Sequence, residues 1–155
     1  MKKLLPLLLA LCCLLLCACA STPKEKEPVP EPEALVAELL ASGAFTEKMT
    51  IADDDVGRFL YALEDLDAPG LRFSFSSGAV AEEIAVLPCA DGENAQTARS
   101  ECSSRLENLV KLFTEYKPDE VPKLEKAMIL QRDNIVVFCV AADAAKAKAV
   151  LDKYF

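Results

Sequence analysis

The chain of 155 residues contains no histidine and no tryptophan. Without His, neither a Ser-His-Asp nor a Cys-His catalytic arrangement can form, and zinc sites with His ligands are excluded. Without Trp, the commonest stacking surface for sugars and quaternary amines is missing. These absences leave carboxylate chemistry open, and they give no reason to expect a cofactor or a metal.

Basic residues are scarce relative to acidic ones, with 17 Lys and Arg against 25 Asp and Glu. The net charge is −8, and it would become −10 if residues 1–18, which contain Lys2 and Lys3, were removed. A charge of this sign repels polyanions, which argues against nucleic acid and anionic lipid headgroups as partners. Cations and basic peptides are more compatible, although acidity also simply keeps an exported domain soluble.

The first nineteen residues, MKKLLPLLLALCCLLLCAC, predict export. Lys2 and Lys3 precede an apolar run over residues 4–18, as in a secretory signal. The run ends in Leu16-Cys17-Ala18-Cys19, which resembles a bacterial lipobox. We therefore expect a signal peptide at residues 1–18 and a diacylglyceryl thioether on Cys19. Two acyl chains suffice for stable anchoring, so the expected location is the outer face of the cell membrane.

Two other interpretations of this stretch are weaker. A transmembrane helix over residues 4–18 would span about 22 Å, which is short of a hydrocarbon core of about 30 Å. A plain secretory signal, cleaved at a site resembling A-x-A, would leave no anchor.

Residues 19–33 form the next region, which is rich in proline and charge and almost free of apolar side chains. Such a composition predicts a semi-extended, disordered tether behind the lipidated Cys19. The remaining residues, 34–155, have the length of a single domain.

The hydrophobic periodicity of this domain predicts alternating groups of helices and strands. Helices are expected at 34–44, from 53 to about 68, at 94–116 and from 143 onward, and strands at 71–76, 83–89, 127–132 and 135–141. The last two strands are predicted to form a hairpin around Asp133-Asn134, with the second strand buried on both faces. Pro88 places the preceding strand at an edge or ends it there. The fold class is α+β, with a small, mostly antiparallel four-stranded sheet and helices packed on one face.

Two charge patterns lie on the expected helices. Asp53, Asp54 and Asp55 stand at a helix start, where capping and the helix dipole explain them better than a metal site without EF-hand spacing. Within 94–116, Glu101 with Arg105 and Glu107 with Lys111 are spaced as ion pairs four residues apart.

Three cysteines, Cys89, Cys102 and Cys139, lie in the domain. Their spacing fits neither a zinc site nor a thioredoxin motif, so the simplest interpretation is three small buried side chains. An exported domain can also oxidise, and a disulfide between Cys89 and Cys102 stays open. Thiol–disulfide chemistry is disfavoured because Cys102 lies well inside a helix, on its buried face.

Carboxylates are the remaining candidates for catalysis. Glu82 and Glu83 stand beside a strand, and Asp91 and Glu93 lie in the following turn. A carboxylate-dependent envelope hydrolase would need two carboxyl groups facing one cleft. Because neighbours on a strand point to opposite faces, Glu82 and Glu83 are not expected to converge, and no catalytic residue is assigned.

The lipobox with its tether, residues 81–86 (AEEIAV), residues 112–118 (LFTEYKP) and the hydrophobic hairpin together resemble an uncharacterised family of small Gram-positive lipoproteins. This family is known as domain of unknown function 4358, and the likeness covers roughly residues 45–155. The resemblance implies an exported lipoprotein, and it carries no catalytic or ligand residue.

The hypothesis that follows is a lipid-anchored, non-enzymatic binding module outside the cytoplasm. Its anchor holds it to the membrane through Cys19, and an envelope protein is the expected class of partner. The alternatives are the carboxylate-dependent hydrolase and a thiol–disulfide protein that uses Cys89 and Cys102.

Overall fold

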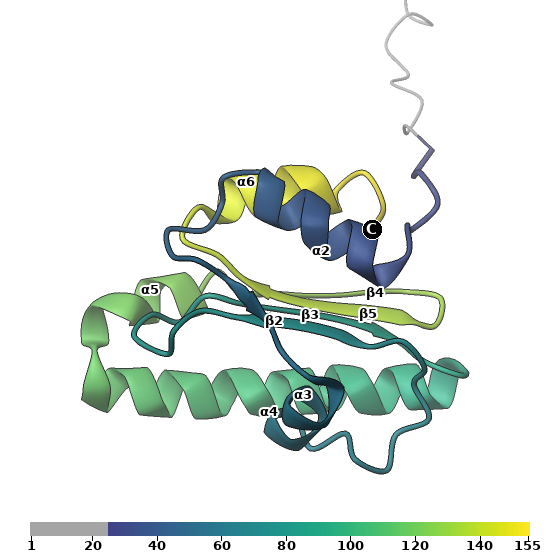
Figure 1. Cartoon of the computed structure of the whole chain (residues 1–155), viewed down its shortest axis with the longest axis horizontal. Helices are drawn as coiled ribbons and strands as arrows, with labels where there is room; N and C mark the ends of the chain where they lie inside the picture. Colours follow the sequence, from purple (N-terminus) through teal and green to yellow (C-terminus); the bar gives the residue numbers. More distant parts are fainter. Residues whose placement is uncertain (1–24) are drawn as a thin grey trace, which may run out of the picture.

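A computed structural model describes residues 25–155, which build a five-stranded antiparallel sheet with strand order β1-β2-β3-β5-β4 (Figure 1). The signal segment 1–18, Cys19 and the first part of the tether lie outside the described residues. The elements are α2 (Pro32–Ala41), β1 (Thr50–Ile51), α3 (Asp54–Leu60), β2 (Arg72–Phe75), β3 (Glu83–Pro88), α4 (Gly92–Tyr116), the 3-10 helix η1 (Pro118–Glu120), α5 (Val121–Leu124), β4 (Met128–Arg132), β5 (Ile135–Val140) and α6 (Ala144–Leu151).

Helices cover both faces of this sheet, with α2 and α6 on one side and α3 and α4 on the other (Figure 1). Strand β3 shows why: Ile84 and Val86 join the core under α2 and α6, whereas Ala85 and Leu87 join the core against α4. The predicted α+β class and antiparallel sheet are confirmed. The prediction that helices pack on one face is corrected, because a continuous apolar strand needs cover on both sides.

The sheet also has one strand more than the four predicted. The extra strand, β1, is only two residues long and pairs Thr50 with Phe75 and Ile51 with Ser74. Both of its side chains are exposed, so it has no apolar alternation from which a strand could be predicted.

The predicted hairpin is confirmed at the other side of the sheet. Arg132 pairs with Ile135 across a two-residue turn in which Asp133 has a positive φ of 52°, a conformation that Asp tolerates better than most residues. Strand β5 is buried on both faces after its first residue, as expected. Strand β3 lies inside the sheet and ends at Pro88.

Two helices differ from the sequence prediction at their ends. Helix α2 starts at Pro32, inside the predicted tether, because proline fits the first turn of a helix. Helix α3 stops at Leu60, well before the expected end near residue 68. Arg58 accounts for this, since its Nη1 donates to the carbonyls of Leu63 and Leu66 and thereby holds the following segment in a turn.

The first described residues dock onto the C-terminal segment. The N–H of Glu27 donates to the carbonyl of Lys153 at 2.8 Å, and Nη1 of Arg132 donates to the carbonyls of Glu27 and Tyr154 at 2.5 and 2.7 Å. The tether therefore reaches the domain on the side of α2 and α6 (Figure 1). Within residues 25–155, no helix combines the length and apolar character needed to cross a bilayer.

Candidate functional site

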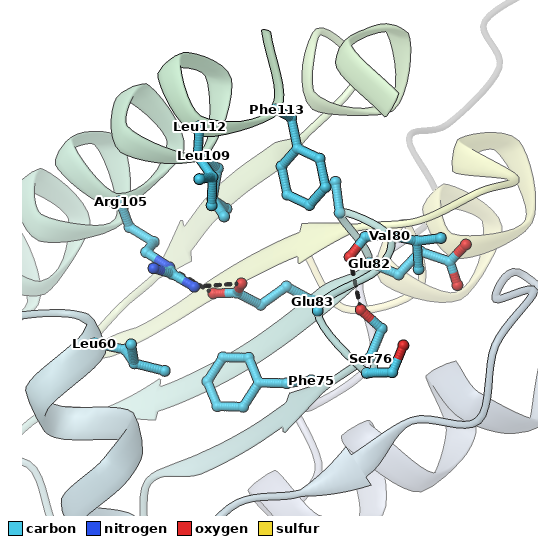
Figure 2. A pocket seen from close by; sticks show the side chains of 13 residues that line it. Leu60, Phe75, Ser76, Val80, Glu82, Glu83, Arg105, Leu109, Leu112 and Phe113 are labelled. Carbon is cyan, nitrogen blue, oxygen red and sulfur yellow. Dashed lines mark hydrogen bonds and ion pairs between the residues drawn. The ribbon is translucent and has the colours of Figure 1, made fainter. Parts of the chain in front are cut away.

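A groove of about 280 Å³ opens between α3 and α4 (Figure 2). We call it the α3–α4 groove. Its lining comes from four elements and one loop: Leu60 of α3, Phe75 of β2, Glu83 of β3, Arg105, Leu109, Leu112 and Phe113 of α4, and residues of the segment 76–82. Glu83 and Arg105 supply its charged groups, and they point toward each other between the apolar walls (Figure 2).

The positions of the lining residues follow from local geometry. On α4, Leu109 follows Arg105 by four residues, and Leu112 and Phe113 follow Leu109 by three and four, so all four side chains share one side of the helix. Phe75 and Glu83 are cross-strand partners of β2 and β3, and their side chains therefore project from the same face of the sheet.

Arg105 binds Glu83 in a bidentate ion pair. Its Nε and Nη2 donate to the two carboxylate oxygens at 3.0 and 2.9 Å, and both side chains are largely buried. Burial alone would lower the pKa of Arg105, but the hydrogen bonds and charge of Glu83 raise it above its usual value. The sequence predicted Glu101 as the partner of Arg105, and this was wrong. Arg105 lies on the buried stripe of α4 with Cys102 and Leu109, which was the available signal.

Tyr61 lies against this ion pair. The guanidinium carbon of Arg105 is 5.7 Å from the centroid of the Tyr61 ring, and within the described chain the Tyr61 hydroxyl has no hydrogen-bond partner. Burial raises the pKa of Tyr61 well above its usual range, and the charge of Glu83 adds to the rise. Tyr61 therefore stays a neutral phenol beneath the pair.

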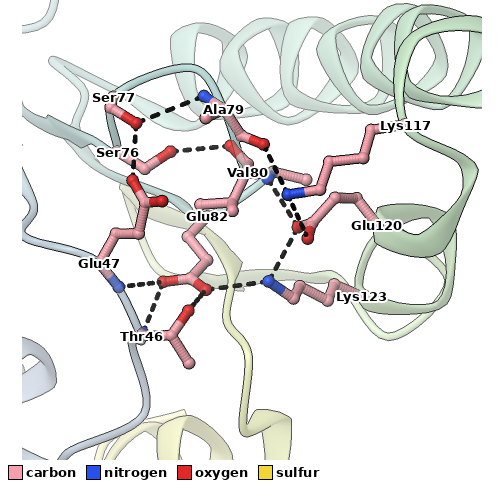
Figure 3. Close-up of polar contacts among 11 residues, drawn as sticks. Thr46, Glu47, Ser76, Ser77, Ala79, Val80, Glu82, Lys117, Glu120 and Lys123 are labelled. Carbon is pink, nitrogen blue, oxygen red and sulfur yellow. Dashed lines mark hydrogen bonds and ion pairs between the residues drawn. The ribbon is translucent and has the colours of Figure 1, made fainter.

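Glu82 belongs to a separate network (Figure 3). Its carboxylate accepts hydrogen bonds from the N–H of Thr46 at 2.8 Å, from the Thr46 hydroxyl, and from Nζ of Lys123 at 3.0 Å. Burial alone would raise the pKa of Glu82, but the bonds from Thr46 and Lys123 hold it below its ordinary value. The side chain is fully enclosed, so this charge is paired inside the protein.

Lys123 also binds Glu120, at 2.8 Å. The carboxylate of Glu120 accepts a hydrogen bond from the N–H of Ala81 at 3.0 Å, and Nζ of Lys117 donates to the carbonyl of Ala79 at 3.1 Å. Burial would raise the pKa of Glu120, but Lys123 and the Ala81 N–H lower it overall. These contacts fasten the segment 76–82, which borders the groove, to η1 and α5 (Figure 3).

The two neighbouring glutamates thus have no partner in common. Glu83 binds Arg105 inside the groove, while the Glu82 carboxylate points away from Arg105 toward Thr46 and Lys123 (Figures 2 and 3). Sequence reasoning named both residues, but it missed Thr46, Glu120 and Lys123, because a contact across 36 or more residues leaves no periodic trace.

The other sequence candidates have local roles. Asp91 is the N-cap of α4, and its side chain accepts a hydrogen bond from the N–H of Asn94 at 2.8 Å, which lowers the pKa of Asp91. Glu93 is exposed in the first turn of the same helix. Neither residue faces the α3–α4 groove.

The aspartate triplet also has a structural position. Asp53 is the N-cap residue of α3 but makes no capping hydrogen bond through its side chain, and Asp54 pairs with Arg58 at 3.1 Å. Among the residues that the structure describes, no group of three or more His, Cys, Asp or Glu side chains is arranged to hold a metal ion.

Cys89, Cys102 and Cys139 are buried free thiols. Burial raises the pKa of Cys89 to about 11, with the charge of Asp91 adding to the effect, and burial raises the pKa of Cys139 to about 12. The pKa of Cys102 rises for the same reason, with a contribution from Glu83. The structure leaves Cys89 and Cys102 unbridged, and a disulfide between them in an oxidising compartment stays a prediction.

Several large apolar side chains are exposed, four of them on α3 and α4. Within residues 25–155 they are Ile51 of β1, Val56 and Phe59 of α3, and Leu112 and Tyr116 of α4. Phe59, Leu112 and Tyr116 are 74%, 57% and 64% exposed. Leu112 itself lines the α3–α4 groove, so the groove has an exposed apolar side chain in its wall.

Comparison with known proteins places this surface inside a family domain. A family model described as "Domain of unknown function (DUF4358)" matches residues 41–141, a range that contains the whole α3–α4 groove and the Glu82 network. Neither the curated proteins nor the solved structures give a significant match to the chain. The match extends over about two thirds of the sequence, and the chain therefore belongs to the DUF4358 family.

Proposed function

We propose that this protein is a lipid-anchored, non-enzymatic binding module on the outer face of the cell membrane, and that the α3–α4 groove is its binding surface. One observation carries the proposal: Val56 and Phe59 of α3 and Leu112 and Tyr116 of α4 are large exposed apolar side chains. Figure 1 shows α3 and α4 on the face of the sheet opposite α2 and α6, where the tether docks. Exposed apolar patches of this kind mark interaction sites.

The tether geometry supports an anchored orientation. Among the residues that the structure describes, Lys26 and Glu27 are the first ones bound to the domain, through the carbonyls of Asp152 and Lys153. A chain of eight residues from Cys19 spans at most about 29 Å, so a lipid on Cys19 would keep the α2 and α6 side near the bilayer. The groove would then face away from the membrane, toward the envelope.

The buried carboxylates favour binding over hydrolysis. A carboxylate-dependent hydrolase needs one carboxyl group that holds a proton and a second one beside it in the same cleft. Glu82 has a lowered pKa, which makes it a poor proton donor, and Glu83 is bound by Arg105 through both oxygens. The raised pKa values of the three thiols likewise disfavour thiol chemistry, which requires a thiolate.

The anchor is tested by intact-mass analysis of the protein from its native membrane, together with labelling by radioactive palmitate. We expect the mass of a chain that begins at Cys19 with a diacylglyceryl group, and we expect the Cys19→Ala variant to lose the label. An unmodified Cys19 in the native protein would refute the anchor.

The binding surface is tested by photo-crosslinking in intact cells. A photoreactive amino acid replaces Leu112 in the groove or, as a matched control, Ala37 on α2, which is also exposed. We expect a discrete adduct from position 112 and none from position 37. Equal labelling from both positions, or none from either, would contradict the assignment of the groove.

A further inference from the structure

The segment that carries Leu60, one of the residues lining the α3–α4 groove, is strongly acidic, and we call residues 53–67 the acidic bank. Residues 53–67 contain six acidic residues and one basic residue, Arg58. All six carboxylates are exposed. The guanidinium of Arg58 is engaged by Asp54 and by the carbonyls of Leu63, Leu66 and Ala68, so it is committed to holding the turn after α3. The bank therefore presents negative charge to its surroundings.

Apolar side chains stand within this acidic bank and across from it. Val56 and Phe59 project from α3, while Leu112 and Tyr116 project from α4. Leu60 and Leu112 line the groove from opposite sides (Figure 2). A groove of about 280 Å³ suits one bulky side chain of a partner, which is the usual form of an anchor at a protein interface.

The interior of the groove adds no net charge. Glu83 and Arg105 neutralise each other through two hydrogen bonds, so an apolar side chain entering between the walls meets a closed ion pair. The charge that a partner meets is instead on the acidic bank, where the carboxylates of Asp53, Asp54, Asp55, Glu64, Asp65 and Asp67 are exposed. Such an arrangement selects for apolar side chains flanked by cations.

We propose that the α3–α4 groove binds a basic amphipathic segment of a partner protein, with a bulky apolar side chain between α3 and α4 and with Lys or Arg against residues 53–67. This inference rests on the proposed function, because it names the partner class of the same surface. A second copy of the chain is a poor occupant, since a symmetric contact would bring the acidic bank against itself. Anionic lipid is repelled by the same charge.

The test uses the full lipidated chain in nanodiscs of phosphatidylcholine, with empty nanodiscs as the background. Three fluorescent synthetic helical peptides serve as probes: one with a Leu/Phe face and Lys elsewhere, one with the same face and Glu elsewhere, and one with Lys and a Ser face. By fluorescence anisotropy, we expect the first to bind at least tenfold more tightly than the other two. Its affinity should also fall as salt rises.

Variants then locate the binding. We expect Phe59→Ser and Leu112→Ser each to weaken binding of the basic amphipathic peptide about tenfold or more, as for interface anchors. Asp55→Asn combined with Glu64→Gln should weaken it about three- to tenfold and flatten the salt dependence. The matched pair Glu31→Gln and Glu33→Gln, which removes two exposed charges at the start of α2, should leave the affinity unchanged.

Three results would overturn the inference. They are equal binding of the acidic peptide, peptide binding that no groove variant weakens, and a dimer in analytical ultracentrifugation that Leu112→Ser abolishes. The proposed function fails separately: a bare Cys19 removes the anchor but leaves peptide binding intact. Conversely, a crosslink from position 112 to a partner segment without basic residues keeps the binding module and refutes this partner chemistry.

Discussion

Arg105 in the middle of α4 grips Glu83 at the first residue of β3, with Nε and Nη2 at 3.0 and 2.9 Å from the two carboxylate oxygens. The pair joins the long helix to the central sheet at the position where the α3–α4 groove opens. The guanidinium of Arg105 also lies over the Tyr61 ring, with its central carbon 5.7 Å from the ring centroid.

Removing the cation of this pair should be costly. We expect Arg105→Met to lower the free energy of unfolding by about 3–5 kcal/mol, because Glu83 would remain as an uncompensated buried charge. Urea denaturation measures the change. The double variant Arg105→Met with Glu83→Gln should recover much of the loss, and Arg99→Met, at an exposed position of the same helix, should stay within about 0.5 kcal/mol of the parent. Equal losses in the single and double variants would contradict this account.

The network of Glu82, Glu120 and Lys123 predicts a loss of stability in acid. Both carboxylates have a pKa below the ordinary value in the folded protein, so the stability they contribute is present above the unfolded pKa of about 4.3. That stability is lost as the pH falls through the folded pKa. We expect the urea midpoint to fall steadily below about pH 4.5.

A variant comparison assigns this acid transition. Glu82→Gln with Glu120→Gln should lower stability at pH 7 and should flatten the pH dependence below about pH 4.5. Asp119→Asn, at an exposed neighbouring position, should keep the parental profile. A double variant whose midpoint still falls as steeply as that of the parent would show that other groups cause the transition.

Replacing Gly57 with alanine should destabilise the protein, although alanine usually stabilises a helix. A Cβ at this position would lie 2.0 Å from Cδ2 of Phe73, so α3 packs on that ring only because the residue has no side chain. We expect Gly57→Ala to destabilise the fold by about 1–3 kcal/mol, although alanine is the better helix former. Gly92→Ala is the control, because a Cβ there has no atom within 4 Å and should be neutral or stabilise by up to about 1 kcal/mol. Thermal unfolding that ranks the two variants the other way would be inconsistent with this packing.

The thiols of Cys89, Cys102 and Cys139 should react slowly with alkylating reagents in the folded protein. Burial raises the pKa of Cys89 to about 11, and it raises the pKa of Cys102 and Cys139 as well, so little thiolate forms near pH 8. We expect slow alkylation by iodoacetamide under native conditions and rapid alkylation of all three in denaturant, counted by mass spectrometry. Rapid labelling of the native protein would disprove the burial, and one alkylated thiol in denaturant would reveal a disulfide.

Sequence patterns predicted the elements that bury one clear stripe or form one tight turn. The stripe of α4 contains Ala95, Ala98, Cys102 and Phe113, and its expected range agrees closely with the helix. The hairpin around Asp133 followed from two apolar runs separated by a two-residue turn. In both cases the determining interactions lie within a few residues along the chain.

Features set by distant contacts could not be predicted. Arg105 has a favourable local partner in Glu101, and only the packing of α4 on β3 gives it Glu83. The segment after Pro118 has the composition of a turn, yet Lys123 there neutralises Glu82 from 41 positions away. The α3–α4 groove itself depends on where α3 and α4 lie on the same face of the sheet, and no local sequence pattern predicts that arrangement (Figure 1).

The docking of Glu27 onto Lys153 and Arg132 has a mechanical consequence. If a lipid holds Cys19, a force that a partner applies to the domain is transmitted to the bilayer through the hydrogen bonds of Glu27 with Lys153 and Arg132. The load would pass through the hairpin and the helices nearest the membrane. The opposite layer, which contains α3 and α4, lies outside this path (Figure 1).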